Sequence, residues 1–262
     1  MFDSPAARGY NMDMKFILDF DRMAYDTDRL LADVISDVTH GGICSEEAYR
    51  MLYKEWSAHA RAIAQVASLP EARQKQMVSW LEGFVPFLAD SIEKNGNREV
   101  LLSELRAIHE KGLSFDYLYP EVRELLSQMP REDRHILTAG GELDQWLKFR
   151  ATRITDLVPE DHIAIVSAKT PEAFQAAYEM WGIRESDIVM HVNDRFDELR
   201  YGRQAHEKTL SVWATWAHPE NATAPAVLPD VVIASSIHEC KDLLNHVAGR
   251  VEVLHRPSVE IG

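Results

Sequence analysis

Two aspartates lie one residue apart, directly after a short apolar run near the start of the chain, in the segment KFILDFDRMAYDT. The run 16–18 is typical of a buried strand, and Asp19 and Asp21 follow it. Ligands of open α/β sheets bind at the carboxyl ends of the strands. Neighbouring carboxylates repel each other unless a cation lies between them, so this pair indicates acid/base chemistry or a hard metal such as Mg²⁺. The same pattern also fits a strand followed by an aspartate-rich turn.

Other polar side chains follow later predicted strands of the chain. Thr138 ends the second strand, Lys169 lies shortly after the third, and Asp194, Asp197 and Glu198 follow the fourth. Each of them has an ordinary structural explanation, as a helix cap, a solvated lysine or an acidic loop. Together they would bring a hydroxyl, a cation and metal ligands to the sheet edge that carries the two aspartates. That combination is what phosphoryl transfer requires.

The segments between these residues predict the elements that must position them. Strands are expected at 16–18, 134–138, 163–166, 187–192, 210–214 and 230–234. Helices are expected at 121–129, 143–150 and 237–247, and another is opened by Thr170 as its N-cap and Pro171 as its first residue. Strands that alternate with helices imply right-handed crossovers and a parallel sheet covered on both faces. The first strand is expected to join this sheet at its centre.

A block without a predicted strand separates the first strand from the others. Amphipathic helices are expected there at 28–40, 45–63, 71–93 and 99–111, with a break near Pro86 in the third. A block of this kind is expected to form a small all-helical domain. The predicted fold class is therefore α/β: a Rossmann-like, doubly wound parallel sheet (1–25 and 116–262) with an inserted helical domain (26–115).

The composition limits the class of protein. The chain has 262 residues, of which 46% are hydrophobic, so it can bury a sizeable core. Its formal net charge of −14 argues against nucleic acid or an anionic membrane as a partner. Its two cysteines, Cys44 and Cys240, form no metal-binding pattern, and no signal peptide or membrane span is recognisable. We therefore expect a soluble cytoplasmic protein with free thiols.

In their order and spacing, the motifs resemble those of the haloacid dehalogenase-like (HAD) hydrolase superfamily, over residues 15 to about 247. The sequence DFD at 19–21 resembles the first family motif, Thr138 the second and Lys169 the third. The segment 193–198 resembles the fourth motif, in which an aspartate is followed four residues later by another acid. The helical block between the first two motifs resembles the helical cap of the C1 subgroup.

The resemblance implies a role for each matching side chain. Asp19 would attack phosphorus and form an aspartyl-phosphate, and Asp21 would protonate the leaving oxygen and then activate water. Lys169 would bind phosphoryl oxygens and keep Asp19 ionised, and Thr138 would donate a hydrogen bond to the phosphoryl group. The implied activity is that of a phosphohydrolase acting on a small phosphorylated metabolite.

The resemblance also implies one Mg²⁺ ion. Asp19, the backbone carbonyl of Asp21, and Asp194 would hold it, and the metal would neutralise the accumulated negative charge. Glu198 is the better match for the outer acid of the fourth motif, although the adjacent Asp197 is an alternative.

Two residues support an alternative function. Family phosphatases usually carry glycine and threonine after the second aspartate, whereas this chain has Arg22 and Met23. The alternative is a catalytically weak or inactive HAD-fold protein that binds phosphate or a partner. Dehalogenation fits less well, because Asp21 is suited to protonating a phosphate leaving group. The sequence specifies neither the substrate nor the oligomeric state.

Overall fold

The structure is a computed structural model, and it describes residues 14–64, 69–92, 97–216 and 231–254. Three sequence predictions fall on residues outside these ranges. They are the absence of a signal peptide near the start of the chain, the end of the helix expected to reach Glu93, and Asp230 as the first residue of the last strand.

Six parallel strands form one sheet within the described residues, in the order β3-β2-β1-β4-β5-β6. Their bounds are β1 Met14–Leu18, β2 Arg134–Ala139, β3 Ile163–Val166, β4 Ile188–Asn193, β5 Thr209–Ala214 and β6 Val231–Ala234. The predicted α/β class is confirmed. β1 lies between β2 and β4, as expected for a central first strand.

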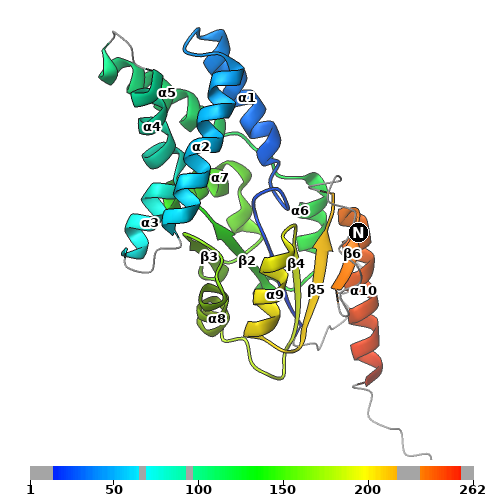
Figure 1. Cartoon of the computed structure of the whole chain (residues 1–262). Coiled ribbons are helices and arrows are strands. Elements are labelled where there is room, and N and C mark those ends of the chain that lie inside the picture. Colours follow the sequence, from blue (N-terminus) through cyan, green and yellow to red (C-terminus); the bar gives the residue numbers. More distant parts are fainter. Residues whose placement is uncertain (1–13, 65–68, 93–96, 217–230, 255–262) are drawn as a thin grey trace, which may run out of the picture.

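Helices cover both faces of this sheet (Figure 1). The flanking helices are α6 Pro120–Ser127, α7 Glu142–Thr152, α8 Pro171–Met180, α9 Phe196–Ala205 and α10 Ile237–Leu254. Short 3₁₀ turns lie at Arg131–Asp133, Ile154–Asp156 and Glu160–His162. Phe16 and Leu18 of β1 belong to the apolar cluster that includes residues of α6, α7 and α10, whereas Ile17 packs with Phe174 and Tyr178 of α8. Because successive residues of a strand face opposite sides, burial on both faces produces the continuous apolar runs seen in the sequence.

Helix α9 was not predicted from the sequence. Its inward side carries Glu198, Leu199 and Gly202, so a charged residue and a glycine interrupt the apolar periodicity that marks a helix. Gly202 lies so close to β4 that an added Cβ would come within 2.5 Å of the Nδ1 atom of His191. The glycine is therefore required by the close approach of helix and strand.

A group of helices, called the cap below, lies between β1 and α6 in the sequence and next to the carboxyl edge of the sheet (Figure 1). It consists of α1 Thr27–His40, α2 Glu46–Ala64, α3 Glu71–Val78, the π-helix η1 Trp80–Phe84, α4 Val85–Ile92 and α5 Arg98–Leu113. Polar side chains at the helix starts satisfy free backbone N–H groups: Asp26 accepts from Arg29 N at 3.0 Å, and Ser45 accepts from Ala48 N at 3.2 Å. Within the described residues, no helix has both the length and the low polarity needed to cross a membrane.

The break predicted near Pro86 lies earlier in the chain, at Ser79. Ser79 is extended, and its hydroxyl accepts from the backbone N–H of Glu82 at 3.1 Å, so a new helical segment begins there. Pro86 is the second residue of α4, and it is accommodated within the continuous run from η1 into α4. The predicted position was wrong: the chain leaves the helix at Ser79, whereas Pro86 directly follows the change from the π-helix η1 to α4 and does not end the run. A proline removes one helical N–H, but it can be accommodated by a local change in the helix without ending it.

The cap joins the sheet domain through two segments that lie side by side. Asp26 N donates to the carbonyl oxygen of Tyr117 at 2.9 Å, and Tyr119 N donates to that of Ala24 at 3.0 Å. The predicted division of the chain at residues 26 and 115 falls in or next to these two segments.

Candidate active site

Asp19 is the first residue after β1, and it is almost completely buried. Its backbone N–H donates to the carbonyl oxygen of Val192 in β4 at 3.2 Å, so the chain is still aligned with the sheet at this point. Its Oδ2 atom lies 2.5 Å from Nζ of Lys169, which comes from the loop between β3 and α8. The structure therefore brings together two predicted site residues that are far apart in the sequence.

Lys169 also contacts Glu198, whose Oε2 atom lies 2.9 Å from Nζ. The same oxygen accepts a hydrogen bond from Asn193 Nδ2 at 3.0 Å, and the other oxygen of Glu198 lies 3.3 Å from Nε of Arg195. Burial opposes a charge on Lys169, but Asp19 and Glu198 outweigh it and raise the lysine pKa. The amine is therefore held as an ammonium ion between two carboxylates.

The geometry separates the two alternatives for the outer acid. Glu198 is buried beside Lys169, whereas Asp197 is exposed and pairs with Nη2 of Arg195 at 3.0 Å. Both residues lie in the first turn of α9, where successive side chains are rotated by about 100° around the helix axis. Of the two acids, only Glu198 is turned toward the described site.

Three carboxylates gather near Lys169, because Asp194 also lies close to Asp19. Burial, and then the negative charges of Glu198 and Asp194, raise the pKa of Asp19 against the opposing effect of Lys169. A cation beside Asp19 and Asp194 would favour the ionised form of Asp19. Mg²⁺ commonly binds through one or two carboxylates and keeps several water ligands, so this pair fits the ion that the sequence motifs led us to expect.

The predicted metal set, which includes the backbone carbonyl of Asp21, stays a prediction. Among the described residues there is no group of three or more His, Cys, Asp or Glu side chains placed to hold a metal ion. Asp19 contacts Lys169 through Oδ2, so its other carboxylate oxygen, together with Asp194, is the candidate for holding a metal ion.

Asp21 lies at the same edge but belongs to a different set of contacts. If the strand had continued, Asp19 and Asp21 would point the same way, but β1 ends at Leu18. The Asp21 carboxylate accepts hydrogen bonds from Lys148 Nζ at 2.6 Å, Gln145 Nε2 at 2.7 Å and Thr27 Oγ1 at 3.0 Å. Each of the two aspartates therefore pairs with a lysine of its own.

The surroundings of Asp21 favour its ionised form. Burial alone would raise its pKa, but the charge of Lys148 and the hydrogen bonds from Lys148, Gln145 and Thr27 together lower it below the usual value. The two aspartates thus differ in environment, with the pKa of Asp19 raised and that of Asp21 lowered. A difference of this kind is common where two carboxylates have different roles.

The two unusual residues of the first motif, Arg22 and Met23, lie in a tight turn after Asp21. Arg22 has φ 64°, a left-handed conformation that glycine adopts without strain, and its guanidinium lies 3.6 Å from Asp28 at the start of α1. Met23 is fully buried. The hydroxyl of Thr27 accepts from Arg22 N at 3.2 Å while it donates to Asp21, so Thr27 supplies a hydroxyl that holds the turn.

Thr138 lies in β2, one residue before its end, and is completely buried. Its hydroxyl has no hydrogen-bond partner among the described residues. The residues that follow it, Ala139, Gly140 and Gly141, line the site cavity, so Thr138 itself lies just beneath the surface. An unpaired buried hydroxyl is costly, and a bound acceptor near this strand end would remove that cost.

A cavity of about 510 Å³ opens between this edge of the sheet and the cap. Asp19, Asp21, Lys148, Lys169, Asp194, Arg195 and Glu198 line it from the sheet domain. The cap contributes Tyr53, Lys54 and Trp56 of α2, with Trp80 of η1. The charged groups are thus concentrated on one side of the cavity and aromatic rings on the other.

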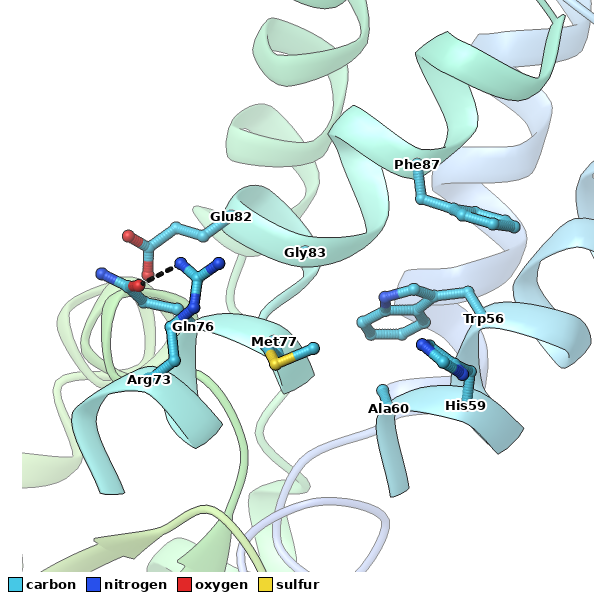
Figure 2. Close-up of a pocket in the computed structure, with 9 residues that line it drawn as sticks. All are labelled: Trp56, His59, Ala60, Arg73, Gln76, Met77, Glu82, Gly83 and Phe87. Atoms are coloured by element: carbon cyan, nitrogen blue, oxygen red, sulfur yellow. Dashed lines mark hydrogen bonds between the residues drawn. The ribbon is translucent and has the colours of Figure 1, made fainter. Parts of the chain in front are cut away.

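A second pocket of about 370 Å³ lies inside the cap, between α2, α3 and the segment from η1 to α4. Figure 2 shows the Trp56 indole in this pocket, with Met77 pointing toward it. Arg73 Nη1 donates to Gln76 Oε1 at 3.1 Å on the opposite side of the pocket. Trp56 and Ala60 line both this pocket and the site cavity, so they belong to the wall that the two spaces share.

Sequence reasoning missed Lys148, Gln145 and Arg195 as members of the site. The first two lie on α7, which was predicted only as a helix that covers the sheet. Both are buried, although lysine and glutamine usually lie at the surface. The signal available in the sequence was a row of polar residues on α7, a helix expected to pack against the sheet. Such a row does not show which residue each side chain contacts.

Neither a known family model nor a curated protein sequence matches this chain. Comparison with solved structures finds similar folds. A HAD-hydrolase from Bacillus subtilis, YfnB, bound to magnesium, is 14% identical, with a TM-score of 0.61 over 90% of this chain and 100% of that one. A haloacid dehalogenase-like hydrolase from Burkholderia xenovorans LB400 is 18% identical, with a TM-score of 0.61 over 88% and 98%. The defluorinating L-2-haloacid dehalogenase Rha0230 is 15% identical, with a TM-score of 0.62 over 93% and 99%.

Proposed function

We propose that this chain, whose fold is that of the HAD-like hydrolases, is a Mg²⁺-dependent phosphohydrolase that acts on a small phosphorylated metabolite through an aspartyl-phosphate. The observation that carries the proposal is the buried contact of Asp19 with Lys169 at 2.5 Å, at the carboxyl edge of the sheet and open to the cavity under the cap. A carboxylate that is aligned by a lysine at such an edge is suited to act as a nucleophile toward a phosphate ester.

In the first step an oxygen of Asp19 bonds to phosphorus, and the bond from phosphorus to the ester oxygen breaks. The leaving oxygen takes a proton from the carboxyl group of Asp21. In the second step the Asp21 carboxylate takes a proton from water, and the water oxygen attacks phosphorus. The bond between Asp19 and phosphorus then breaks, and both aspartates return to their starting forms. The donors around Asp21 favour the carboxylate that this second step needs.

The neighbouring polar groups would stabilise the charge that develops on the phosphoryl group. Lys169 is placed to bind a phosphoryl oxygen, and Glu198 and Asn193 keep it in position. The free hydroxyl of Thr138 lies beneath the glycine-containing loop after β2 and can donate to a bound oxygen. Asp19 and Asp194 would hold Mg²⁺, which supplies Lewis-acid stabilisation of the transferring group.

The cap side of the cavity would surround the leaving group. Tyr53, Trp56 and Trp80 offer aromatic surface there, and Lys54 offers a positive charge. We therefore propose a cap that works as in the C1 subgroup, covering the sheet edge and excluding water during the reaction.

A screen of phosphorylated metabolites with Mg²⁺, alongside the Asp19→Asn variant, tests this proposal. Hydrolysis that depends on both Mg²⁺ and Asp19 is the expected result. Beryllofluoride, a mimic of the phosphoryl group on aspartate, should inhibit the wild-type protein and raise its melting temperature in the presence of Mg²⁺. The Asp19→Ala variant should show neither effect.

A non-catalytic phosphate-binding protein is the second candidate, and the contacts of Asp21 favour it. Three donors occupy that carboxylate, which makes proton delivery to a leaving group less favourable. A wild-type protein that binds inorganic phosphate but ignores beryllofluoride, and hydrolyses neither phosphate esters nor haloacids, would establish this candidate in place of the enzyme.

A further inference from the structure

We propose that one face of α7, formed by Asp144, Gln145 and Lys148, couples the seating of the cap to the orientation of the Asp21 carboxylate. The inference rests on the proposed function only in the role that it gives to Asp21. The three side chains belong to one helix of the sheet domain, yet one of them contacts the cap and the other two contact the site.

Asp144 holds the start of η1. One of its carboxylate oxygens accepts from the Ser79 hydroxyl at 3.0 Å and from the backbone N–H of Leu81 at 3.3 Å. The other oxygen accepts from the backbone N–H of Trp80 at 2.5 Å. The two N–H donors, of Trp80 and Leu81, are free backbone groups of a helical start, where a negative charge is favourable. A carboxylate of the sheet domain therefore caps the N-terminus of a helix that belongs to the cap.

The contact between cap and α7 is close as well as polar. A Cβ added at Gly141, the residue before α7, would lie 2.3 Å from the Cβ of Ser79. Gly141 has φ −69°, so its backbone conformation does not require glycine. The glycine is needed because the cap packs directly on the backbone there, and the seating of the cap is correspondingly well defined.

Gln145 and Lys148 hold the catalytic side. Their side chains are 2% and 6% exposed, and they donate to different oxygens of Asp21, Oδ2 at 2.7 Å and Oδ1 at 2.6 Å. Because both oxygens are engaged, rotation of the carboxylate is restricted. Lys148 also lies over the ring of Tyr25, 5.3 Å from its centroid, which fixes the ammonium group in turn.

The spacing of the three side chains places them on one side of the helix. Asp144 and Lys148 are four residues apart, and Gln145 and Lys148 are three apart, so each pair is adjacent on the helix surface. A helix moves as a rigid body over such a short distance, so a shift of α7 that satisfies Asp144 also positions Gln145 and Lys148. Lifting the cap would remove all three donors from Asp144 and with them the contact that holds α7 in this position. Relaxation of α7 would then release Asp21.

Paired variants test the coupling. Asp144→Asn weakens the cap contact, Lys148→Met removes the main donor to Asp21, and the double variant combines them. Glu142→Gln is the matched control, because it is on the same helix and its exposed carboxylate also faces the cap, 3.5 Å from Nζ of Lys75. That exposed pair should contribute little, and Glu142 makes no described contact with Asp21.

The first measurement is kcat/KM for a series of substituted phenyl phosphates that differ in the acidity of the phenol. A loss of Asp21 orientation should slow the esters of weakly acidic phenols most, because their leaving oxygen needs the proton. In Asp144→Asn and Lys148→Met, kcat/KM should therefore depend more steeply on the acidity of the phenol than in the wild type. The loss of kcat/KM should be about tenfold larger for the ester of the least acidic phenol than for that of the most acidic one. The double variant should be no steeper than either single variant. Glu142→Gln should match the wild type.

The second measurement does not depend on activity. Coupling between two sites is reciprocal, so Lys148→Met should increase amide hydrogen exchange at Trp80 and Leu81, although it does not contact them. Glu142→Gln should leave that exchange unchanged. If the wild-type protein hydrolyses no ester, the proposed function fails, and the exchange measurement still decides the coupling.

Three results would overturn the inference. The first is an equal loss on all esters in Asp144→Asn, which would mean a purely structural role. The second is additive effects in the double variant, and the third is unchanged exchange at η1 in Lys148→Met.

Discussion

The interior of the cap and the edge of the sheet below it bury polar groups in different ways. In the cap, His109 is fully buried, with Nδ1 2.7 Å from the Leu105 carbonyl oxygen and Nε2 2.8 Å from the Tyr49 hydroxyl oxygen. The rings of Trp80 and Phe84 pack against it. Burial lowers the pKa of His109 to about 4, although the Leu105 carbonyl opposes the shift, so the imidazole is neutral at pH 7.

The sheet edge buries full charges instead. Asp19 and Glu198 share Lys169, and Asp21 pairs with Lys148, with separations of 2.5 to 2.9 Å. Buried ion pairs gain electrostatic energy but lose hydration, so they contribute little net stability, whereas well-packed neutral groups contribute a great deal. The comparison teaches that the cap should carry stability and the sheet edge should carry function.

The strongest test of this division is Asp19→Asn. We expect kcat to fall by on the order of 10⁴-fold, because the nucleophile is lost. The free energy of unfolding should fall by no more than about 1 kcal/mol, because Glu198 still pairs with Lys169 and burial already disfavours a charge on Asp19. Steady-state kinetics and urea unfolding check the two parts. A large loss of stability would show that the ion pairs at the edge hold the fold together.

Phe84→Ala should have the opposite effect. Phe84 is fully buried and packs against Tyr49, Tyr53, Trp56 and His109. Removing its ring should lower the free energy of unfolding by about 3–5 kcal/mol, as measured by urea unfolding. Phe84→Leu is the control and should lose clearly less, because it keeps most of the apolar volume. Equal losses in the two variants would contradict packing as the source of stability.

The neutral state of His109 predicts a pH dependence. Its pKa is lower in the folded protein than in the unfolded chain, where it is about 6.5, so the unfolded chain takes up the proton first. The stabilising contribution is therefore complete above pH 6.5 and is lost as the pH falls toward 4. At pH 5 the loss should be about 2 kcal/mol.

Urea unfolding of His109→Gln and of the wild type at several pH values isolates the contribution of His109 to the pH dependence of stability. The variant should be less stable at pH 7 but should lose less stability on acidification. His135 and His191, whose pKa values are also lowered by burial, to about 3, remain in both proteins. An unchanged slope between pH 6.5 and 4 would show that His109 is not the source of the acid sensitivity.

The smallest expected effect is at Arg22, in the turn that joins the two regions. A non-glycine residue in the left-handed conformation costs about 1–2 kcal/mol, and glycine costs about 0.5–1 kcal/mol in chain entropy, so Arg22→Gly should stabilise by about 0.5–1 kcal/mol. Arg22→Ala keeps the strained backbone and removes the charge, so it should not stabilise. If Arg22→Ala raised the free energy of unfolding as much as Arg22→Gly, the arginine side chain and not the backbone conformation would be the source of the effect.

The strands and most helices could be predicted from the sequence because their signals are local. Apolar runs marked the strands, and Thr170 and Ser45 marked helix starts, where they accept hydrogen bonds from backbone N–H groups three residues later. The positions of Asp19, Lys169 and Asp194 followed for the same reason. Each comes just after a strand, and parallel strands bring their carboxyl ends to one edge.

What the sequence could not determine depends on contacts between distant segments. The partner of Asp21 is Lys148, 127 positions away, and no local pattern selects it from the other lysines. The contact of Asp144 with the start of η1 spans more than 60 positions, and no local pattern predicts it. The sequence by itself thus determined the strands, most of the helices, and the polar side chains that directly follow the strand ends. Only the packing of α7 between cap and sheet decided which lysine pairs with Asp21, because an ion pair is chosen by distance in space.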